Sequence, residues 1–185
     1  PSLGVLSKAA TLGEDVTGVV LGSGVKEIAS GAGKFGAAKV LVVDKPELEA
    51  PLPQPRVDAL ASIVKDRSFD TVLFAASVLS ADVAAGLSAR LQAGLNWDLT
   101  DLVQQDGNLI GKRPALGDSV YVDVGWRSEP RIALIRAGTF DPQETGGEAE
   151  VEEVDAQFED FSTAATMVER AHAESEGPSI EDADV

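Results

Sequence analysis

The stretch from Asp70 to Phe140 decides the fold. It opens with the apolar run TVLFA at residues 71–75, continues with an amphipathic helical pattern, and then passes into short extended runs around GKRPALGD at residues 111–118. A continuous apolar run of this length favours a strand that is buried on both faces of a parallel sheet. The later change from a helical period to an alternating one predicts a β-hairpin region after the last helix of the stretch.

Two further apolar runs precede this stretch, VTGVVL at residues 16–21 and VLVV at residues 40–43. Between the runs, apolar residues recur at helical spacing, so each set forms one stripe that can cover a sheet face. The two sets are Val25, Ile28, Ala29 and Ala32, and Val57, Leu60, Ala61 and Val64. Alternation of strand and helix predicts βαβ crossovers. We therefore expect an α/β fold, Rossmann-like and doubly wound around a mostly parallel sheet, with a β-hairpin extension.

The first residues predict a helix, because Leu3, Leu6 and Ala10 share one face of a helical pattern. A strand usually precedes such a helix in a doubly wound fold, so we expect that the first strand is missing from this sequence. The start also has no initiator Met and no secretory signal pattern, which favours a chain that begins inside a longer protein.

Local signals mark the helix and the hairpins after residue 75. Ser80 is a fair N-cap, and Gly94 would end the helix as a left-handed residue. Asp106-Gly107-Asn108 is a strong hairpin-turn signal, and Gly117-Asp118 predicts a second turn. The predicted strand residues beyond these turns are Val120, Val122 and Val124, followed by the apolar run at 132–135.

The charge is spread unevenly along the chain. Residues 1–140 hold 16 acids and 14 bases, whereas residues 141–185 hold 15 acids and the single base Arg170, so almost all of the net charge of −16 lies in the C-terminal segment. We expect a Rossmann-like domain over 1–140 and an acidic linker over 141–185. Phe161, Ala164, Ala165 and Val168 predict one helix in that linker, ending near Ala173. The linker reads as a solvated segment or as a docking surface for a basic partner.

Composition excludes several classes of function. The acidic tail repels phosphates, so nucleic-acid binding is not expected. No apolar run approaches the roughly 18 residues of a membrane helix, so membrane insertion is not expected either. With no Cys, the chain has no disulfide, no thiolate metal site and no cysteine nucleophile, which fits a cytoplasmic protein. His172 is the only histidine and has no companions for a metal site or a catalytic triad.

Two glycine-rich segments resemble phosphate-binding loops in their residue pattern. The glycines at 31–36 come after a helical pattern and before a strand, which is the wrong order for a dinucleotide fingerprint, so we interpret them as a helix-terminating turn. Gly22-Ser23-Gly24 does follow a strand, but the third glycine position is Glu27, whose carboxylate would repel a phosphate. This loop leaves open a free-standing adenine-nucleotide-binding α/β module as the alternative function. We find no autonomous active site, and so expect no enzyme in this chain.

The order of motifs resembles the N-terminal domain of the electron transfer flavoprotein alpha subunit, whose fold is adenine-nucleotide-hydrolase-like. The motifs that carry the resemblance are Ala89-Arg90-Leu91, Gly94-Leu95, Asp98-Leu99-Thr100-Asp101, Arg113-Pro114 and Ile135-Arg136-Ala137-Gly138-Thr139-Phe140. Ala183-Asp184-Val185 resembles the lead-in to the family's flavin domain. The chain departs from the family at Ser80 and Ala81, where relatives often carry Gly and a base, and at Gly86, where a basic residue is common.

The resemblance implies an alpha/beta heterodimer that takes electrons from flavin dehydrogenases, such as the acyl-CoA dehydrogenases of fatty acid beta-oxidation. It would pass them to the electron transfer flavoprotein-quinone oxidoreductase of the membrane. FAD would lie in the C-terminal domain, which is absent from this sequence, and AMP in the beta subunit. The location would be the cytoplasm of a bacterium or the mitochondrial matrix. This chain would be a scaffold that pairs with the beta subunit.

The pairing surface is predicted in the hairpin region. Arg113, Tyr121, Trp126 and Arg127 concentrate there, and Trp, Tyr and Arg are enriched at protein interfaces. The other interpretation is that these side chains pack the edge of the sheet. No cofactor-binding residue and no metal ligand is predicted in this chain.

Overall fold

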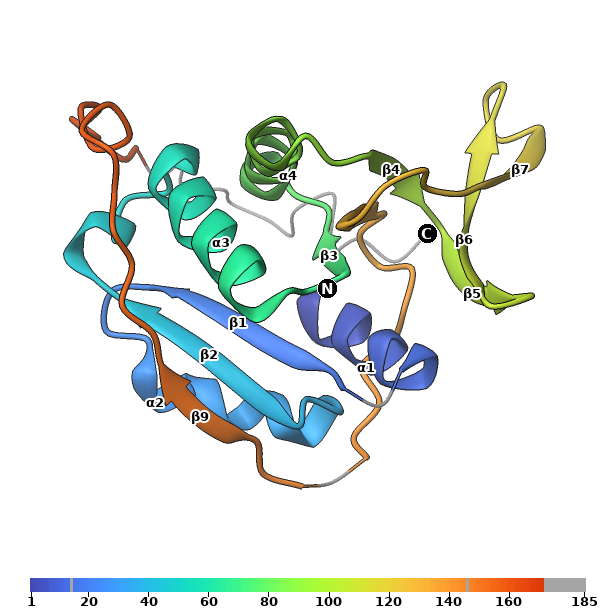
Figure 1. Ribbon diagram of the computed structural model, residues 1–185, viewed down its shortest axis with the longest axis horizontal. Helices are drawn as coiled ribbons and strands as arrows, with labels where there is room; N and C mark the ends of the chain where they lie inside the picture. Colours follow the sequence, from blue (N-terminus) through green and yellow to red (C-terminus); the bar gives the residue numbers. More distant parts are fainter. Residues whose placement is uncertain (14, 146, 172–185) are drawn as a thin grey trace, which may run out of the picture.

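Three small sheets form the framework of the protein, which was analysed as a computed structural model that describes residues 1–13, 15–145 and 147–171. Two sheets are parallel and have the strand orders β1-β2-β9 and β3-β8-β4, while the third is antiparallel with the order β5-β6-β7. Figure 1 shows the antiparallel sheet projecting from one end of the molecule. The strands are β1 (Thr17–Gly22), β2 (Lys39–Asp44), β3 (Thr71–Ala75), β4 (Leu95–Leu99), β5 (Asp101–Gln105), β6 (Asn108–Ala115), β7 (Val120–Val124), β8 (Arg131–Ile135) and β9 (Glu150–Glu153).

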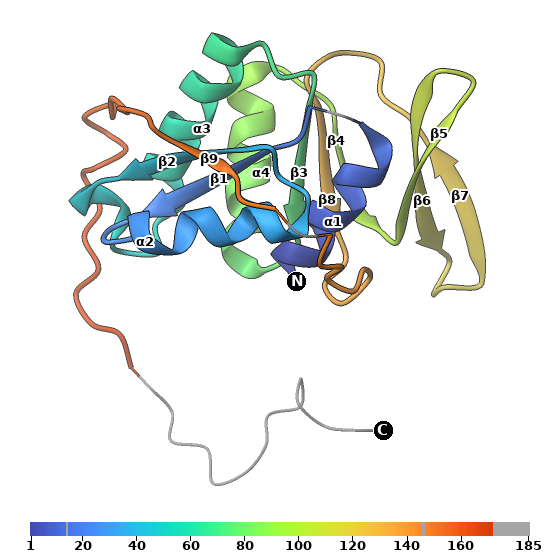
Figure 2. The same ribbon diagram turned by 90° about the horizontal axis from the view of Figure 1, so that it is seen from below.

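Helices cover both faces of the parallel sheets. On one face, apolar residues of α3 and α4 pack on β1, β3 and β8, and on the other face α1 packs on the same strands. Figures 1 and 2 show α3 and α4 on one side of the strands and α1 and α2 on the other. The predicted Rossmann-like, doubly wound α/β fold is therefore confirmed. The helices are α1 (Ser2–Leu12), α2 (Lys26–Ala29), α3 (Pro53–Arg67) and α4 (Val78–Leu91), with 3-10 helices at Ser30–Phe35 and Pro46–Leu48.

The ends of α4 differ from the prediction. The N-cap is Ser77, and its side chain accepts a hydrogen bond from the backbone N–H of Ser80, whose own side chain accepts one from the N–H of Ser77. Ser80 is therefore not the N-cap but the third helical residue, which completes this capping box. The helix begins at Val78, soon after β3 ends at Ala75. The left-handed residue at the C-terminus is Gln92, at φ 53°, instead of Gly94.

The predicted turns of the antiparallel sheet are confirmed. Asp106 and Gly107 connect β5 to β6 and have φ values of 52° and 78°, the left-handed pair that a tight two-residue hairpin requires. Gly117 and Asp118 lie in the wider turn between β6 and β7, again with positive φ.

The segment after residue 140 does not simply leave the domain. Glu150–Glu153 forms β9, which pairs in parallel with β2 and was not predicted. Basic residues of β2, α2 and α3 neutralise its carboxylates: Lys39 lies 3.3 Å from Glu150 and 3.2 Å from Glu152, Lys26 lies 2.7 Å from Glu153, and Arg67 contacts Glu152. Beyond β9, Ala156 is buried in the core beside α3. The folded unit thus continues past residue 140.

The predicted helix at 161–173 is wrong over the described residues, because 154–171 holds only turns and irregular backbone. Phe161 is 60% exposed and Val168 is 96% exposed, so the apolar residues at helical spacing have no surface to cover. Instead, the carboxylate of Asp58 on α3 fixes this segment by accepting a hydrogen bond of 2.9 Å from the backbone N–H of Glu159. Residues 172–185, which include His172, Ala173 and Ala183-Asp184-Val185, lie outside the described residues. Among the described helices, none is long and apolar enough to cross a membrane.

Candidate interaction surface of the hairpin sheet

The antiparallel sheet places the predicted residues Arg113 and Tyr121 on opposite faces. Arg113 of β6 lies opposite Val122 of β7, and the next pair along is Pro114 with Tyr121. Directly opposed residues share a face and neighbours along a strand alternate. One face therefore holds Arg113 with Val122, and the other holds Tyr121, which is 67% exposed.

The face with Arg113 is covered at one end and open at the other. Leu102 and Leu109 are buried against the core at its covered end. Gly111 allows this close packing, since an added Cβ would lie 2.9 Å from a methyl group of Leu99. At the open end, Val120 and Val122 are 42% and 40% exposed. The sheet thus extends past the core with an apolar face.

Trp97 continues this open face. It lies in β4 and is 55% exposed, and the guanidinium of Arg113 stacks 4.7 Å from the centre of its ring. The Nε of Arg113 is buried and has no hydrogen-bond partner among the described residues. We call Trp97, Arg113, Val120 and Val122 the hairpin patch. Three of these four residues were not predicted as site residues, although Val120 and Val122 were recognised as strand residues.

An ion-pair network borders the hairpin patch. Arg136 donates hydrogen bonds of 2.8 and 3.0 Å to the two carboxylate oxygens of Asp98, and its guanidinium also lies 3.3 Å from Asp118. The hydrogen bonds from Arg136 lower the pKa of Asp98, and those same bonds raise the pKa of Arg136. The network joins the carboxyl ends of β4 and β8 to the turn between β6 and β7. Both Asp98 and Arg136 belong to motifs that carry the family resemblance.

Trp126 packs toward the core, whereas Trp97, Val120 and Val122 of the hairpin patch are exposed. Its indole N–H donates a 2.9 Å hydrogen bond to the carbonyl of Ile132, and its half-buried ring contacts the core cluster that includes Leu102. This arrangement matches the other interpretation of the sequence, in which Trp126 packs the edge of the sheet. Arg127 is exposed in the same loop.

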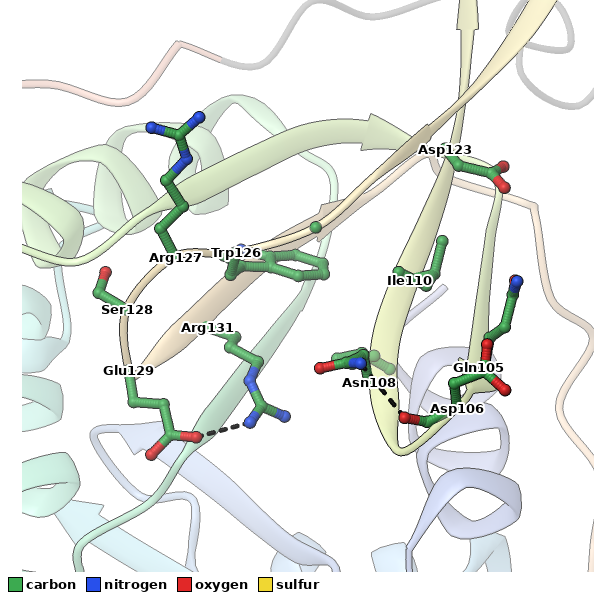
Figure 3. Close-up of a pocket in the computed structure, with 12 residues that line it drawn as sticks. Gln105, Asp106, Asn108, Ile110, Asp123, Trp126, Arg127, Ser128, Glu129 and Arg131 are labelled. Atoms are coloured by element: carbon green, nitrogen blue, oxygen red, sulfur yellow. Dashed lines mark hydrogen bonds and ion pairs between the residues drawn. The ribbon is translucent and has the colours of Figure 1, made fainter.

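Trp126 and Arg127 belong to a separate open hollow of about 700 Å³ beside the β5–β6 turn. In Figure 3 the ring of Trp126 points toward Ile110, whereas the side chain of Arg127 points away from the hollow. Glu129 and Arg131 form a 2.5 Å ion pair on its rim. The structure therefore brings the four predicted residues into one region of the fold but not onto one surface.

The chemistry of these residues is that of packing and ion pairing. Among the described residues, no group of three or more His, Asp or Glu side chains could hold a metal ion. The hollow contains paired charges and amides but neither a His nor a Cys that could act as a nucleophile or base.

The Gly22-Ser23-Gly24 loop is occupied by the protein's own carboxylate. Asp44, at the end of β2, accepts hydrogen bonds of 2.8 Å from the N–H of Gly24 and 3.0 Å from that of Val25. These bonds, first the one from Gly24, lower the pKa of Asp44. A phosphate would need the same amide donors and would meet this negative charge. The geometry therefore disfavours the adenine-nucleotide module. The glycines at 31–36 lie within and after a 3-10 helix that ends at Gly36, which agrees with the predicted turn.

Comparison with known proteins gives one consistent family. The electron transfer flavoprotein domain matches residues 1–159. The chain is 29% identical over 185 residues to the electron transfer flavoprotein subunit alpha of Megasphaera elsdenii, covering 96% of this chain and 54% of that protein. It is 26% identical over 162 residues to the subunit alpha of Bacillus subtilis, covering 86% and 50%.

A third relative is named as a subunit of a different protein. The LctC subunit of the lactate dehydrogenase (NAD(+),ferredoxin) of Acetobacterium woodii is 27% identical over 165 residues, covering 87% of this chain and 40% of that protein. The chain thus spans about half the length of the curated relatives it matches. Parallel strands with helices on both faces agree with these matches: the chain belongs to the electron transfer flavoprotein family, as an N-terminal domain of the alpha type.

Proposed function

We propose that this chain is the scaffold domain of an electron transfer flavoprotein alpha subunit and that it pairs with a beta subunit through the hairpin patch. The chain carries electrons only as part of the whole protein and has no active site of its own. The family match supports this role.

The hairpin patch is the observation that carries the proposal. Val120 and Val122 expose about two fifths of their surface on a strand face that is covered elsewhere by the core. Trp97 and Arg113 form a stacked pair beside them, and these two residue types are the commonest energetic anchors of protein interfaces. Because the Arg136 network fixes the hairpin turn, the patch is held in place before a partner binds, which lowers the entropy cost of pairing.

The whole protein would act as an electron shuttle. It takes electrons from flavin dehydrogenases, such as the acyl-CoA dehydrogenases of fatty acid beta-oxidation, and passes them to the electron transfer flavoprotein-quinone oxidoreductase. FAD belongs to the C-terminal domain of the alpha subunit and AMP to the beta subunit. The protein works in the bacterial cytoplasm or the mitochondrial matrix. The family membership supports these roles, which the other half of the alpha subunit and the partner would perform.

Two matched valine substitutions test the pairing surface. Val122→Asp places a charge in the hairpin patch, and Val151→Asp does the same on β9, where the valine is exposed to a similar degree, 41% against 40%. We expect Val122→Asp to weaken binding of the cognate beta subunit by about 30-fold or more, which corresponds to roughly 2 kcal/mol. The carboxylate would replace apolar contact area and, directly opposite Arg113, would compete with the partner for that guanidinium. Val151→Asp should leave the affinity within about threefold of wild type.

Isothermal titration calorimetry gives the affinities, and circular dichroism shows whether each variant is folded. If the wild-type chain does not associate with the beta subunit at micromolar concentrations, the scaffold role is wrong. If both variants weaken binding equally, the pairing surface lies elsewhere than in the hairpin patch.

A further inference from the structure

Arg113 lies in the middle of the hairpin patch, between an aromatic ring and a valine. It belongs to β6, is directly opposite Val122 of β7, and places its guanidinium 4.7 Å from the centre of the Trp97 ring. A guanidinium is planar, and when it stacks on an aromatic face its N–H groups point outward in that plane. Trp97 therefore fixes the plane in which Arg113 can donate hydrogen bonds.

The guanidinium of Arg113 has no acceptor among the residues that the structure describes. Its Nε is buried without a hydrogen-bond partner, and its two terminal nitrogens reach the surface. The nearby Arg131 and Arg136, in contrast, each hold a carboxylate. Buried donors in folded proteins are nearly always paired, and an orphaned one costs free energy. The described part of the chain thus leaves the N–H donors of Arg113 unused.

The carboxylates beside Arg113 are already engaged. The hydrogen bond from Arg136 is the main cause that lowers the pKa of Asp98, and the charge of Arg113 adds to it, so Arg113 and Asp98 are neighbours. Both carboxylate oxygens of Asp98, however, accept hydrogen bonds from Arg136, at 2.8 and 3.0 Å. Asp118 also contacts Arg136, and Asp123 lies 2.6 Å from the ammonium of Lys112. None of these carboxylates is free to serve Arg113.

The surroundings of Arg113 decide which kind of group it can take. Trp97 is 55% exposed and Val122 is 40% exposed, so a partner that covers the hairpin patch removes the guanidinium from water together with this apolar surface. A guanidinium that leaves water without an acceptor is costly, so the covering surface needs an acceptor at this point. A carboxylate matches the fork of N–H groups. A doubly charged phosphate would be repelled more strongly by the carboxylates of Asp98 and Asp118.

The apolar part of the hairpin patch also decides where the carboxylate comes from. Residues 172–185 of this chain contain several acids, but Ile180 and Val185 are their only large apolar side chains. That composition is poorly suited to covering the exposed ring and valines of the patch. A folded partner can present an apolar surface and a carboxylate together. The alpha-type family membership favours the beta subunit as this partner.

We propose that Arg113 is the receptor for one carboxylate of the beta subunit, an Asp or Glu side chain that accepts hydrogen bonds from both terminal nitrogens of the guanidinium. Trp97 is a positioning residue, because it holds the guanidinium in its plane before the partner arrives. Arg136 has a second role, since it keeps Asp98 from pairing with Arg113. This inference rests on the proposed pairing with a beta subunit and adds the chemistry of the partner's side.

The substitution Arg113→Met separates binding from folding. Methionine keeps a long apolar side chain beside Trp97 but has no N–H group. We expect the affinity for the cognate beta subunit, measured by isothermal titration calorimetry, to fall by about 30-fold or more. The midpoint of urea unfolding of the chain alone should not fall, because the substitution removes a buried donor that has no partner. A lower midpoint would show that the guanidinium serves this chain's own fold and would overturn the proposal.

Two further variants test the geometry of the contact. Arg113→Lys keeps the charge but replaces the planar fork with a single ammonium, so it should still weaken binding by about tenfold. Arg127→Met is the matched control, because Arg127 is exposed and lies outside the hairpin patch. It should leave the affinity within about threefold of wild type. Full affinity of Arg113→Lys, or equal losses in Arg113→Met and Arg127→Met, would overturn the two-point contact.

Double-mutant cycles identify the partner's group. Single Asp→Asn and Glu→Gln variants of the beta subunit are titrated with the wild-type, Arg113→Met and Arg127→Met chains. We expect one carboxylate of the beta subunit to couple to Arg113 by at least about tenfold in affinity and none to couple to Arg127. The proposal is wrong if no carboxylate couples to Arg113. It is also wrong if the chain alone binds inorganic phosphate and Arg113→Met abolishes that binding.

Failure of this inference differs from failure of the scaffold role. If Arg113→Met binds the beta subunit as tightly as wild type while Val122→Asp binds weakly, only the role of Arg113 is wrong. If the wild-type chain does not bind the beta subunit at micromolar concentrations, the scaffold role and the role of Arg113 are both wrong.

Discussion

Arg136 and Asp98 form a two-point ion pair in which the Nε and one terminal nitrogen of the guanidinium lie 2.8 and 3.0 Å from the two carboxylate oxygens. Arg136 directly follows β8, and Asp98 lies within β4 at a positive φ of 60°. The pair therefore ties the ends of two adjacent strands. Through Asp118 it also sets the position of the β6–β7 turn next to the hairpin patch.

Replacing Asp98 with Asn should change the acid side of the stability profile. The folded-state pKa of Asp98 is lowered, so its carboxylate contributes stability above the unfolded pKa and loses that contribution as the pH falls through the folded pKa. We expect Asp98→Asn to be less stable than wild type between about pH 5 and pH 8, and the difference to shrink below about pH 4. Urea unfolding over a pH series measures this. Asp118→Asn is the control and should have a smaller effect, because Asp118 lies farther from Arg136. A difference that stays constant down to about pH 3 would contradict the pairing.

Replacing Asp58 with Ala should release the segment that follows β9. Asp58 is 5% exposed, lies 2.9 Å from the guanidinium of Arg90, and accepts the N–H of Glu159. Loss of both partners should lower the free energy of unfolding by about 2 kcal/mol, measured by urea denaturation. Asp66→Ala, on the exposed face of the same helix, should change it by less than about 0.5 kcal/mol. Equal effects of the two variants would show that the buried carboxylate does not fix the segment.

Replacing Gly33 with Ala should displace the approach to β9. An added Cβ at Gly33 would lie 2.1 Å from the backbone nitrogen of Ala149, so backbone must move. We expect a loss of about 2 kcal/mol in the free energy of unfolding and faster hydrogen exchange in β9. Gly31→Ala, in the same 3-10 helix, has no atom within 4 Å of the added Cβ and should cost less than about 0.5 kcal/mol. Slow exchange in β9 of the Gly33 variant would contradict this account.

Replacing Trp126 with Ala should destabilise the fold. Any loss of pairing with the beta subunit should be a result of that destabilisation. The substitution removes a half-buried ring and the hydrogen bond to Ile132, so we expect a loss of about 2–3 kcal/mol in thermal or urea unfolding. Arg127→Ala, one residue further along, should change stability by less than about 0.5 kcal/mol because its side chain is exposed. A stable Trp126→Ala protein with weakened affinity for the beta subunit would restore Trp126 as an interface anchor.

The parallel strands β1, β2, β3 and β8 and the hairpin turns could be predicted because their signals are local. The continuous apolar runs in β1, β2, β3 and β8 are typical of buried strands. Asp106-Gly107 specifies a two-residue hairpin turn because both residues adopt the positive φ that this turn requires. The N-cap of α4 was shifted by three residues because Ser77 and Ser80 are both good caps, and only the end of β3 decides between them.

Features that depend on distant partners could not be predicted. β9 is a strand because Lys39, Lys26 and Arg67 neutralise its carboxylates, but its sequence Glu-Val-Glu-Glu is typical of a solvated segment. Basic side chains from residues 1–140 and the acidic side chains of β9 thus form complementary surfaces within one fold. Trp97 was overlooked for the same reason: its exposure and its contact with Arg113 depend on how the hairpin crosses β4.

The acidic strand β9 has a consequence for the behaviour of many copies together. It is the outermost strand of its sheet, and outer strands are the sites where proteins join edge to edge and aggregate. Glu150 and Glu153 keep much of their surface in water even while paired with lysines, so two copies approaching along this edge would bring carboxylates against carboxylates. The carboxylates of β9, which form ion pairs within the fold, thereby also oppose the edge-to-edge association of neighbouring molecules. Screening by high salt would weaken that repulsion.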